Sequence, residues 1–449
     1  MAEKDLFPGL ARHAPAAASA FGYSSGLIPG NGGFVERFTG LIGLAVVLAV
    51  ALALSKNRRA IRWRTIGWAF GLQLAFGLLV LYWERGKEAL ESFSNGVSHA
   101  IAYADQGSGF LFGWLAGPMD TLGEKTGMPL RGFVFAFKVL PIIIFICAFF
   151  SVLYHFGIIQ WIVKGMAWGM QKTMKVSGAE SLCVAANVFI GQTEAPVLIA
   201  PYIAAMTTSE LLTMMIGGMA HVSGAVMLAY VTMGAPLKYL ITASVMAAPG
   251  TFLISKILWP ETEAPATMGT VKMQVEKTSA NFIDAAASGA SQGMMLVLNI
   301  SAMLIAFVAL IAMLNGFLGW IGHFWGDPAF SLQTIFGWIL GPLAYILGAP
   351  KQDAATVGNL IANKTVINEF FAFSMMKDVV GSLSEKGKII ATFALCGFAN
   401  FSSIGIQIGG IGGLAPSRKA DLARLGFRAL LGGSLVSFMT AAIAGILMG

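Results

Sequence analysis

Long hydrophobic runs separated by short polar segments dominate the pattern of this chain. A helix of about 20 apolar residues is long enough to span the hydrocarbon core of a bilayer. Eight runs have that character and are predicted to be transmembrane helices: Phe38–Leu54, Ile66–Trp83, Phe133–Tyr154, Leu211–Val231, Tyr239–Leu258, Met294–Trp320, Ile389–Leu414 and Leu422–Met448. The fold class predicted by this pattern is an all-α polytopic membrane protein.

Two further apolar segments, residues 181–203 and 352–376, contain polar residues near their centres. In the first, Asn187–Pro196 combines a glycine and a proline with Glu194 and three other polar side chains. The second carries Lys364 and Glu369 in a similar position. Charges at membrane depth are costly, and irregular backbone survives there only where protein or water shields it. Both segments are therefore predicted to be re-entrant hairpins, and the first is interpreted as half of a binding site.

Glycine and polar residues also interrupt two of the eight predicted spans. The interruptions are Gly217–Gly224 in the fourth span and Phe398–Ser403 in the seventh. The order of hairpin, broken helix and plain helix thus occurs twice, at 181–258 and 352–448, and the two copies enter the membrane from opposite sides. Such inverted repeats are typical of secondary transporters. Alternatively, the glycines merely kink packed helices. That interpretation does not explain why Glu194 and Glu369 stand in matching positions.

The remaining segments are predicted to lie outside the hydrocarbon core. Residues 1–35 lack the basic start and apolar core of a signal peptide, so we expect a retained, loosely ordered leader. Amphipathic stretches at 84–131, 158–175 and about 328–350 are predicted to lie on the membrane surface. Glu180 and Lys351, which precede the two hairpins, are expected to be solvated.

Composition and charge support the membrane class. The 449 residues are 56% hydrophobic and only 11% charged, with a mean hydropathy of +0.74, whereas soluble domains carry about 25% charged residues. The net charge of +7 comes from short loops beside hydrophobic runs, which indicates topology signals and not binding of nucleic acid. Basic residues between Lys56 and Arg64 place that loop in the cytoplasm and the N-terminus outside. No nucleophile–base pair and no metal-like cysteine spacing is present, so we expect no enzyme and no cofactor.

Three motifs resemble the concentrative nucleoside transporter family, bacterial type. Gly191-Gln192-Thr193-Glu194-Ala195-Pro196 is similar to its first-hairpin motif, and Phe398-Ala399-Asn400-Phe401-Ser402-Ser403 to its second broken helix. Ala362-x-Lys364-x3-Asn368-Glu369-Phe370-Phe371-Ala372 resembles its second-hairpin signature, with Phe371 where valine is usual. The resemblance covers roughly residues 35–449. It implies eight spans plus two re-entrant hairpins, a homotrimer in the inner membrane, and nucleoside uptake coupled to sodium or protons.

The expected domain organisation follows from this architecture. Residues 36–175 are predicted to form a scaffold that builds the trimer, together with the sixth span in the segment 259–350. Residues 176–258 and 351–449 are predicted to form the two repeats of a transport domain. Alternating access is expected to come from movement of that domain against the scaffold.

The resemblance also implies roles for eight substrate-binding residues. Gln192, Thr193 and Glu194 would face the nucleobase, with Val226 and Phe398 packing on it. Glu369, Asn400 and Ser403 would bind the ribose hydroxyls. A neutral nucleoside needs a few placed hydrogen-bonding groups on an apolar lining, and a carboxylate that accepts from hydroxyls makes strong charge-assisted bonds. The sequence leaves open whether uridine, adenosine or similar nucleosides are preferred.

By the same resemblance, sodium would be bound by Asn187, the Ile190 carbonyl, His221 and Val222. Family members that use sodium carry a small hydroxyl residue where this chain has His221, which removes one oxygen ligand. An imidazole could titrate near neutral pH and repel sodium when protonated. Alternatively, His221 points away and bonds a neighbouring backbone group. Sodium is expected ahead of protons because Asn187 and the backbone ligands remain.

Other interpretations stay open at this point. An intramembrane enzyme acting on a lipid- or nucleotide-linked substrate would need a catalytic group near a membrane face and a basic phosphate-binding patch, whereas Glu194 and Glu369 are predicted to lie deep. A passive channel has no need of two hairpins that block the midplane. Lys364 would either neutralise a nearby carboxylate or cap a helix end with its charge in water.

Overall fold

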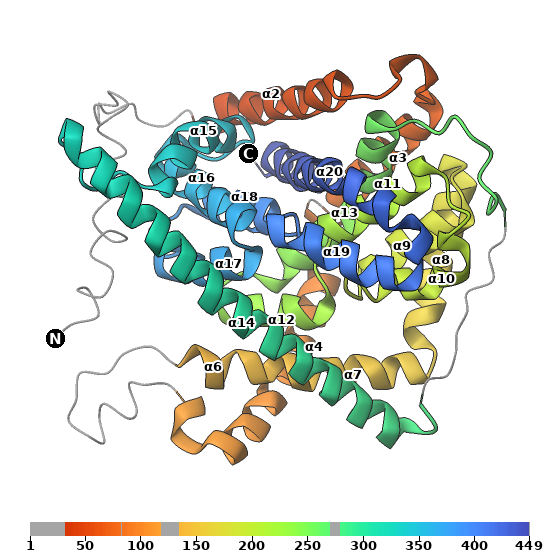
Figure 1. Cartoon of the computed structure of the whole chain (residues 1–449), viewed down its shortest axis with the longest axis horizontal. Helices are drawn as coiled ribbons and strands as arrows, with labels where there is room; N and C mark the ends of the chain where they lie inside the picture. Colours follow the sequence, from red (N-terminus) through yellow and green to blue (C-terminus); the bar gives the residue numbers. More distant parts are fainter. Residues whose placement is uncertain (1–31, 82, 118–133, 270–278, 449) are drawn as a thin grey trace.

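Every secondary-structure element in the described part of the chain is helical (Figure 1). The computed structural model describes residues 32–81, 83–117, 134–269 and 279–448. Its α-helices are α2 (Gly32–Ala53), α3 (Trp63–Leu81), α4 (Glu84–Phe112), α6 (Phe135–Lys138), α7 (Leu140–His155), α8 (Ile158–Met174), α9 (Gly178–Asn187), α10 (Ala200–Ile203), α11 (Thr208–Ala220), α12 (Gly224–Thr232), α13 (Leu237–Leu258), α14 (Phe282–Gly322), α15 (Leu332–Ile346), α16 (Lys351–Val366), α17 (Glu369–Val379), α18 (Glu385–Leu395), α19 (Phe401–Leu414) and α20 (Lys419–Leu447). Short 3-10 turns lie between them, among them η4 (Ala195–Ile199). The predicted all-α class is thus confirmed.

Six helical segments of the described chain are long and apolar enough to cross a membrane: Trp63–Leu81, Phe135–His155, Thr208–Thr232, Leu237–Leu258, Phe282–Trp325 and Pro416–Leu447. They correspond to six of the eight predicted spans. The other two predicted spans contain the shorter apolar helices Phe38–Ala53 and Phe401–Leu414. The number of eight spans therefore stays a prediction.

Several predicted boundaries differ from the structure. The sixth span is part of a 41-residue helix, α14, which begins at Phe282 and not at Met294. The third is split at Val139 into α6 and α7, close to Pro141, whose ring nitrogen cannot donate a helical hydrogen bond. The surface segment predicted over 84–131 contains the single long helix α4, while residues 118–133 and 1–31 lie outside the described residues.

Small residues hold α14 against α7. A Cβ atom on Gly289 would lie 2.7 Å from the Cys147 carbonyl oxygen, and one on Gly293 would lie 2.7 Å from Ile144 Cα. These glycines let the two backbones approach closely, as small residues do in membrane proteins. Most of the rest of α14 is exposed, and in Figure 1 the helix runs diagonally across the other elements.

Helices α2 and α3 pack elsewhere. Among their helix neighbours, α2 contacts mainly α20, and α3 contacts mainly α13. Gly40 of α2 approaches Ile446 of α20, and Gln73 of α3 lies against Gly250 of α13. The first two predicted spans thus pack mainly on α20 and α13, which lie in the segments predicted to form the two repeats.

The two broken helices cross where their backbones are extended. Between α11 and α12, His221 has φ −109° and ψ 164°, and its carbonyl accepts a 3.2 Å hydrogen bond from the Phe398 N–H in the break between α18 and α19. Gly397 in that break has φ +127°, and a Cβ there would lie 2.9 Å from the carbonyl oxygens of Met219 and Ala220. Only glycine fits such a conformation at such a close approach.

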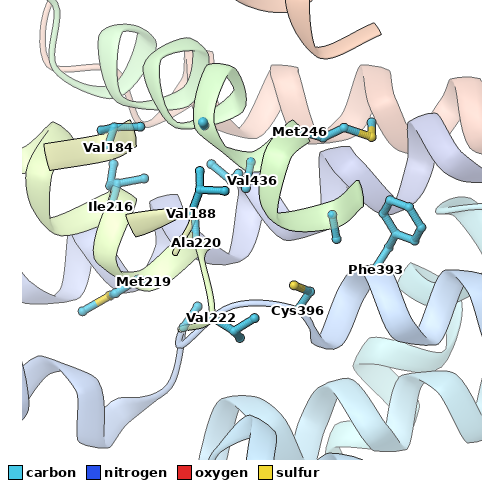
Figure 2. Packing of buried hydrophobic residues seen from close by; sticks show 14 of the residues in the cluster. Val184, Val188, Ile216, Met219, Ala220, Val222, Met246, Phe393, Cys396 and Val436 are labelled. Atoms are coloured by element: carbon cyan, nitrogen blue, oxygen red, sulfur yellow. The ribbon is translucent and has the colours of Figure 1, made fainter. Parts of the chain in front are cut away.

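Buried apolar side chains surround this crossing. Figure 2 shows Val184 of α9, Ile216 and Met219 of α11, Met246 of α13 and Val436 of α20 packed around it. The interruptions predicted at 217–224 and 398–403 thus overlap real breaks, which the structure places at 221–223 and 396–400 inside a closely packed apolar core.

The solvated position expected for Glu180 is wrong. Its residue is 1% exposed, and its carboxylate lies 2.6 Å from the Lys256 ammonium of α13. The other carboxylate oxygen accepts from the Ser177 N–H, which completes a capping box at the start of α9. Lys256 also donates to Ser209 at 3.0 Å. Lys351, by contrast, is exposed as expected.

A second capping box, at the start of α11, is joined to the first by the loop 260–267. Thr207 donates to Glu261 at 2.8 Å, and Thr267 donates to Glu210 at 3.1 Å. The Thr267 carbonyl accepts from the Gly178 N–H at 2.8 Å. The loop therefore ties the base of α9 to the base of α11, and we call it the strap.

Candidate functional site

The first predicted hairpin turns at a short irregular segment. Helix α9 ends at Asn187, and the backbone is not helical again until η4 begins at Ala195. The Glu194 carboxylate lies in the space that a side chain on Gly191 would take. Glu194 itself is exposed, whereas Gln192 is buried, and the methyl group of Thr193 lies against Gly410 of α19. The polar residues predicted in this motif thus project in different directions from one turn.

The second predicted hairpin has its turn at Ile367–Asn368, between α16 and α17. Asn368 caps α17 by accepting a 2.8 Å hydrogen bond from the Phe371 N–H. Glu369 follows as the first residue of α17 and is 5% exposed. Its carboxylate therefore lies close to the positive end of the α17 dipole.

Glu369 is the centre of a carboxylate cluster. Its Oε1 accepts from the Tyr230 hydroxyl at 3.1 Å, and its Oε2 accepts from Asn400 Nδ2 at 2.8 Å. Asn400 Oδ1 in turn accepts from the Ser403 N–H at 2.9 Å, which caps α19. Because a carboxylate offers about four acceptor positions, Glu369 can accept further hydroxyl donors.

An amide cluster lies on the other side of Ser403. Gln192 Nε2 donates to Ser403 Oγ at 3.2 Å, and Gln192 Oε1 accepts from Gln407 Nε2 at 3.1 Å. Residues from the first turn, the second turn and the second broken helix are thus connected through α19. Val226, on α12, is buried, and Phe398 is partly exposed. These hydrogen bonds bring together four of the predicted substrate-binding residues, Gln192, Ser403, Asn400 and Glu369, whereas Glu194 is exposed.

Lys364 combines parts of the two roles left open for it. Its residue is 1% exposed, so its charge is not in water. The ammonium donates to the Ala394 carbonyl at 2.9 Å and to Ser437 Oγ at 3.3 Å. Ala394 lies in the last turn of α18, where a cation is favourable. Lys364 therefore caps the helix before the second break from inside the protein.

Two of the residues predicted to hold the ion, Asn187 and His221, lie against Gly217. A Cβ on Gly217 would lie 3.3 Å from Asn187 Nδ2, and the Gly217 carbonyl lies 2.7 Å from His221 Nδ1. Because a carbonyl only accepts, Nδ1 carries the hydrogen and neutral Nε2 is an acceptor. Within the described residues, His221 Nε2 and Asn187 Oδ1 are both buried without hydrogen-bond partners.

Two acceptors left unpaired inside a protein are costly, and a cation or a proton would pair them. The bond from His221 to a backbone carbonyl is also the alternative expected from the sequence. Val222 is buried and Ile190 is partly exposed at the end of the first turn. In the described chain no group of three or more His, Cys, Asp or Glu side chains suits a metal ion.

Two members of these clusters are absent from the sequence-based prediction, Tyr230 and Gln407. Gln407 is a completely buried amide in the otherwise apolar helix α19, and a polar residue at membrane depth is a signal of function. Tyr230 stands at the end of an apolar helix, where tyrosine is ordinary, and it gives no such signal.

Comparison with known proteins agrees with this arrangement. Residues 239–445 match the family profile of the Na+ dependent nucleoside transporter C-terminus, residues 42–115 match its N-terminus, and residues 136–237 match a nucleoside recognition (gate) profile. An uncharacterised transporter of Haemophilus influenzae is 47% identical over 415 residues, which are 91% of this chain and 97% of that protein. The nucleoside permease NupC of Helicobacter pylori is 42% identical over 414 residues, 91% of this chain and 97% of the permease.

Solved structures of the transporter CNTnw are also similar. Its inward-facing, substrate-bound state has a TM-score of 0.85 at 45% identity, over 92% of this chain and 98% of CNTnw. A double variant of CNTnw in an outward-facing state has a TM-score of 0.87, with the same identity and coverage. These relatives are membrane transporters and not enzymes. Over nearly its whole described length, the chain is a member of the concentrative nucleoside transporter family.

Proposed function

We propose that this protein is a secondary active symporter that imports nucleosides across the inner membrane by alternating access. The observation that carries the proposal is the continuous polar connection from Gln192 through Ser403 and Asn400 to Glu369. It joins both turns to the second broken helix, where inverted-repeat transporters hold their substrates. The nucleosides named for its relatives have the hydrogen-bonding groups that such a site needs.

The two clusters suit the two ends of a nucleoside. The carboxylate cluster around Glu369, Asn400 and Ser403 binds the ribose hydroxyls through charge-assisted hydrogen bonds. The amide of Gln192, with Thr193 and Glu194, faces the base, and the apolar side chains of Val226 and Phe398 pack on it. The direct bond from Gln192 to Ser403, at 3.2 Å, opens when the substrate enters between them.

The test is uptake of labelled uridine into liposomes that contain the purified protein. Accumulation against a concentration gradient, dependent on an imposed ion gradient, is expected. Equilibration without accumulation would instead favour a passive channel, and chemical change of the substrate would favour an enzyme. Competition by other nucleosides in the same assay gives the order of preference.

The moving unit is expected to comprise both repeats together with α2 and α3. The proposed scaffold is therefore smaller than the segment 36–175 expected from the sequence. Helices α2 and α3 are assigned to the moving unit because they pack on α20 and α13. The stationary scaffold is then the α7–α14 pair, and the exposed apolar side of α14 is the surface on which three copies of the chain associate. We propose that the N-terminus lies outside the cell, because basic residues between Lys56 and Arg64 directly follow the first predicted span.

Crosslinking distinguishes the two groupings. In a background without Cys147, we expect a bifunctional thiol reagent joining Phe150→Cys of α7 to Gly224→Cys of α12 to stop transport, because Gly224 lies directly against the Phe150 ring. The matched pair Gly40→Cys and Ile446→Cys, which joins α2 to α20, should leave transport intact. Transport that continues after the first crosslink contradicts the moving unit, and loss after the second returns α2 to the scaffold.

Sodium is proposed as the coupling ion, with a proton as the alternative. Asn187 Oδ1 is a buried oxygen without a partner in the described chain, and such an oxygen suits a hard cation. The Ile190 and Val222 positions supply backbone carbonyls, and the His221 carbonyl already accepts one hydrogen bond. Neutral His221 Nε2 is the group that a proton would occupy.

Uptake should rise with sodium at constant pH, and His221→Ser should strengthen that dependence by adding a hydroxyl ligand. The control is His155→Ser, which removes a histidine that bonds Ser279 at 2.9 Å near the end of α7. It should change neither ion response. Uptake that ignores sodium but follows an inward proton gradient, and loses its pH response in His221→Ser, would assign the coupling to protons.

A further inference from the structure

We propose that Gln407 is a positioning residue that fixes which end of the Gln192 amide faces the substrate. Gln192 then acts as a hydrogen-bond donor, and the site favours bases that present an acceptor to it. The inference rests on the nucleoside site proposed above. It concerns a residue that lies behind that site, on the buried side of α19.

The two hydrogens of the Gln407 amide have two separate partners. Nε2 donates to the Met215 carbonyl of α11 at 3.0 Å and to Gln192 Oε1 at 3.1 Å. A side-chain amide nitrogen carries two hydrogens, so both are used. Gln407 is 0% exposed, which keeps water from competing for these bonds.

The Met215 carbonyl sets the direction of the whole chain of bonds. A backbone carbonyl can only accept, so the reversed Gln407 amide would place Oε1 against another oxygen. With Nε2 held there, Gln192 must turn its own oxygen toward Gln407. The Gln192 nitrogen therefore points the other way, where one hydrogen reaches Ser403 Oγ at 3.2 Å. Its second hydrogen is available to a substrate, and the first becomes available when the bond to Ser403 opens.

The packing leaves room for this pair of amides. A Cβ on Gly218 would lie 2.6 Å from Gln407 Nε2 and 2.9 Å from Gln192 Cβ. Gly218 follows Met215 by three residues, so the glycine and the accepting carbonyl lie on the same face of α11. The backbone of the first broken helix thus provides both the acceptor and the space.

The other end of Gln407 argues against a role in packing alone. Its Oε1 is buried and has no hydrogen-bond partner within the described residues. An unpaired buried acceptor lowers stability, and an apolar side chain of similar size would avoid that cost. An amide at this position is an advantage only if the two N–H groups of Gln407 have a function.

A Gln192 that donates favours a base edge with a carbonyl oxygen or an unprotonated ring nitrogen. Uracil presents carbonyl oxygens. An exocyclic amino group facing Gln192 would meet another donor, and such mismatched polar pairs are strongly discriminated in buried sites. The polarity set by Gln407 is therefore predicted to determine the order in which nucleosides are preferred.

The experiment compares Gln407→Leu with wild type in liposomes, using uridine, cytidine and adenosine. We expect the KM for uridine to rise about threefold to tenfold, as for loss of one hydrogen bond, and the order of preference among bases to change. The ratio of uridine to 2′-deoxyuridine reports the ribose end and should stay constant. Gln73→Leu, which removes another completely buried amide on α3, is the control and should leave base preference unchanged.

A double-mutant cycle tests whether Gln407 acts through Gln192. Adding Gln407→Leu to Gln192→Ala should cause no further change in base preference. If the Gln407→Leu protein cannot be produced in folded form, Gly218→Ala is the substitute. It crowds the same two amides and should cause the same change in base preference. Equal loss for all nucleosides, additive with Gln192→Ala, would overturn the inference. Absence of nucleoside uptake in the wild type would instead remove the proposed function.

Discussion

Replacing Lys256 by methionine should destabilise the protein by about 3–5 kcal/mol, the cost of leaving a buried charge unpaired. Lys256 is 5% exposed, and its ammonium lies 2.6 Å from the Glu180 carboxylate and 3.9 Å from that of Glu261. Without it, two carboxylates remain buried at the base of α9. The free energy of unfolding in detergent, measured by denaturant titration, checks this expectation.

The control for this prediction is Lys238→Met. Lys238 pairs with Glu91 at 2.9 Å, but both side chains are substantially exposed, at 38% and 54%. Such a pair contributes about 1 kcal/mol or less. Adding Glu180→Gln to Lys256→Met should recover part of the lost stability because it removes the unpaired charge. If the Lys256 and Lys238 variants lost the same small amount, the buried pair would have no special importance.

Glu369→Gln should weaken nucleoside binding by about 1.5–3 kcal/mol, the usual contribution of hydrogen bonds to a charged group. This corresponds to a rise of roughly tenfold to a hundredfold in the dissociation constant. The substitution keeps the shape but replaces one acceptor by a donor. Asn400 Nδ2 can only donate, so the new amide nitrogen would face the Tyr230 hydroxyl, which must then accept. Isothermal titration with uridine, and the KM of uptake, measure the loss.

Two comparisons give this second prediction its specificity. The loss should shrink for 2′,3′-dideoxyuridine, which lacks the hydroxyls that Glu369 is proposed to bind. Tyr230→Phe removes one donor but leaves the carboxylate, so a smaller loss is expected. Equal losses for uridine and its dideoxy analogue would place the ribose away from Glu369.

The positions of the turns and breaks could be predicted because they interrupt the long apolar runs of the sequence. Polar residues, glycine and proline inside apolar runs are costly at membrane depth. At Asn187–Pro196, Gly217–Gly224 and Phe398–Ser403 they mark the places where the structure leaves helical geometry. The family motifs then supplied the proposed roles of Gln192 and Glu369.

What the sequence could not provide depends on contacts between distant residues. Glu180 at the start of an apolar run looks solvated, because its partner Lys256 lies on another helix. The nearly fully buried α13 and the largely exposed α14 are both apolar in sequence, so apolar character alone does not reveal which helices pack together. For the same reason the packing of α2 on α20 and of α3 on α13 was not predicted. Tyr230 gains its importance only from its bond to Glu369, and the partners of Gln407 lie on other segments of the chain.

The strap has a consequence for how the protein is made. Its residues 260–267 connect the bases of α9 and α11, yet they are synthesised after both helices. Translation adds about 5–20 residues per second. Lys256 and Thr267 therefore emerge from the ribosome several seconds after their partners Glu180 and Glu210. The base of α9 therefore lacks these bonds until α13 and the strap have been made. We expect α9, α11 and α13 to reach their final packing together, after the strap has emerged.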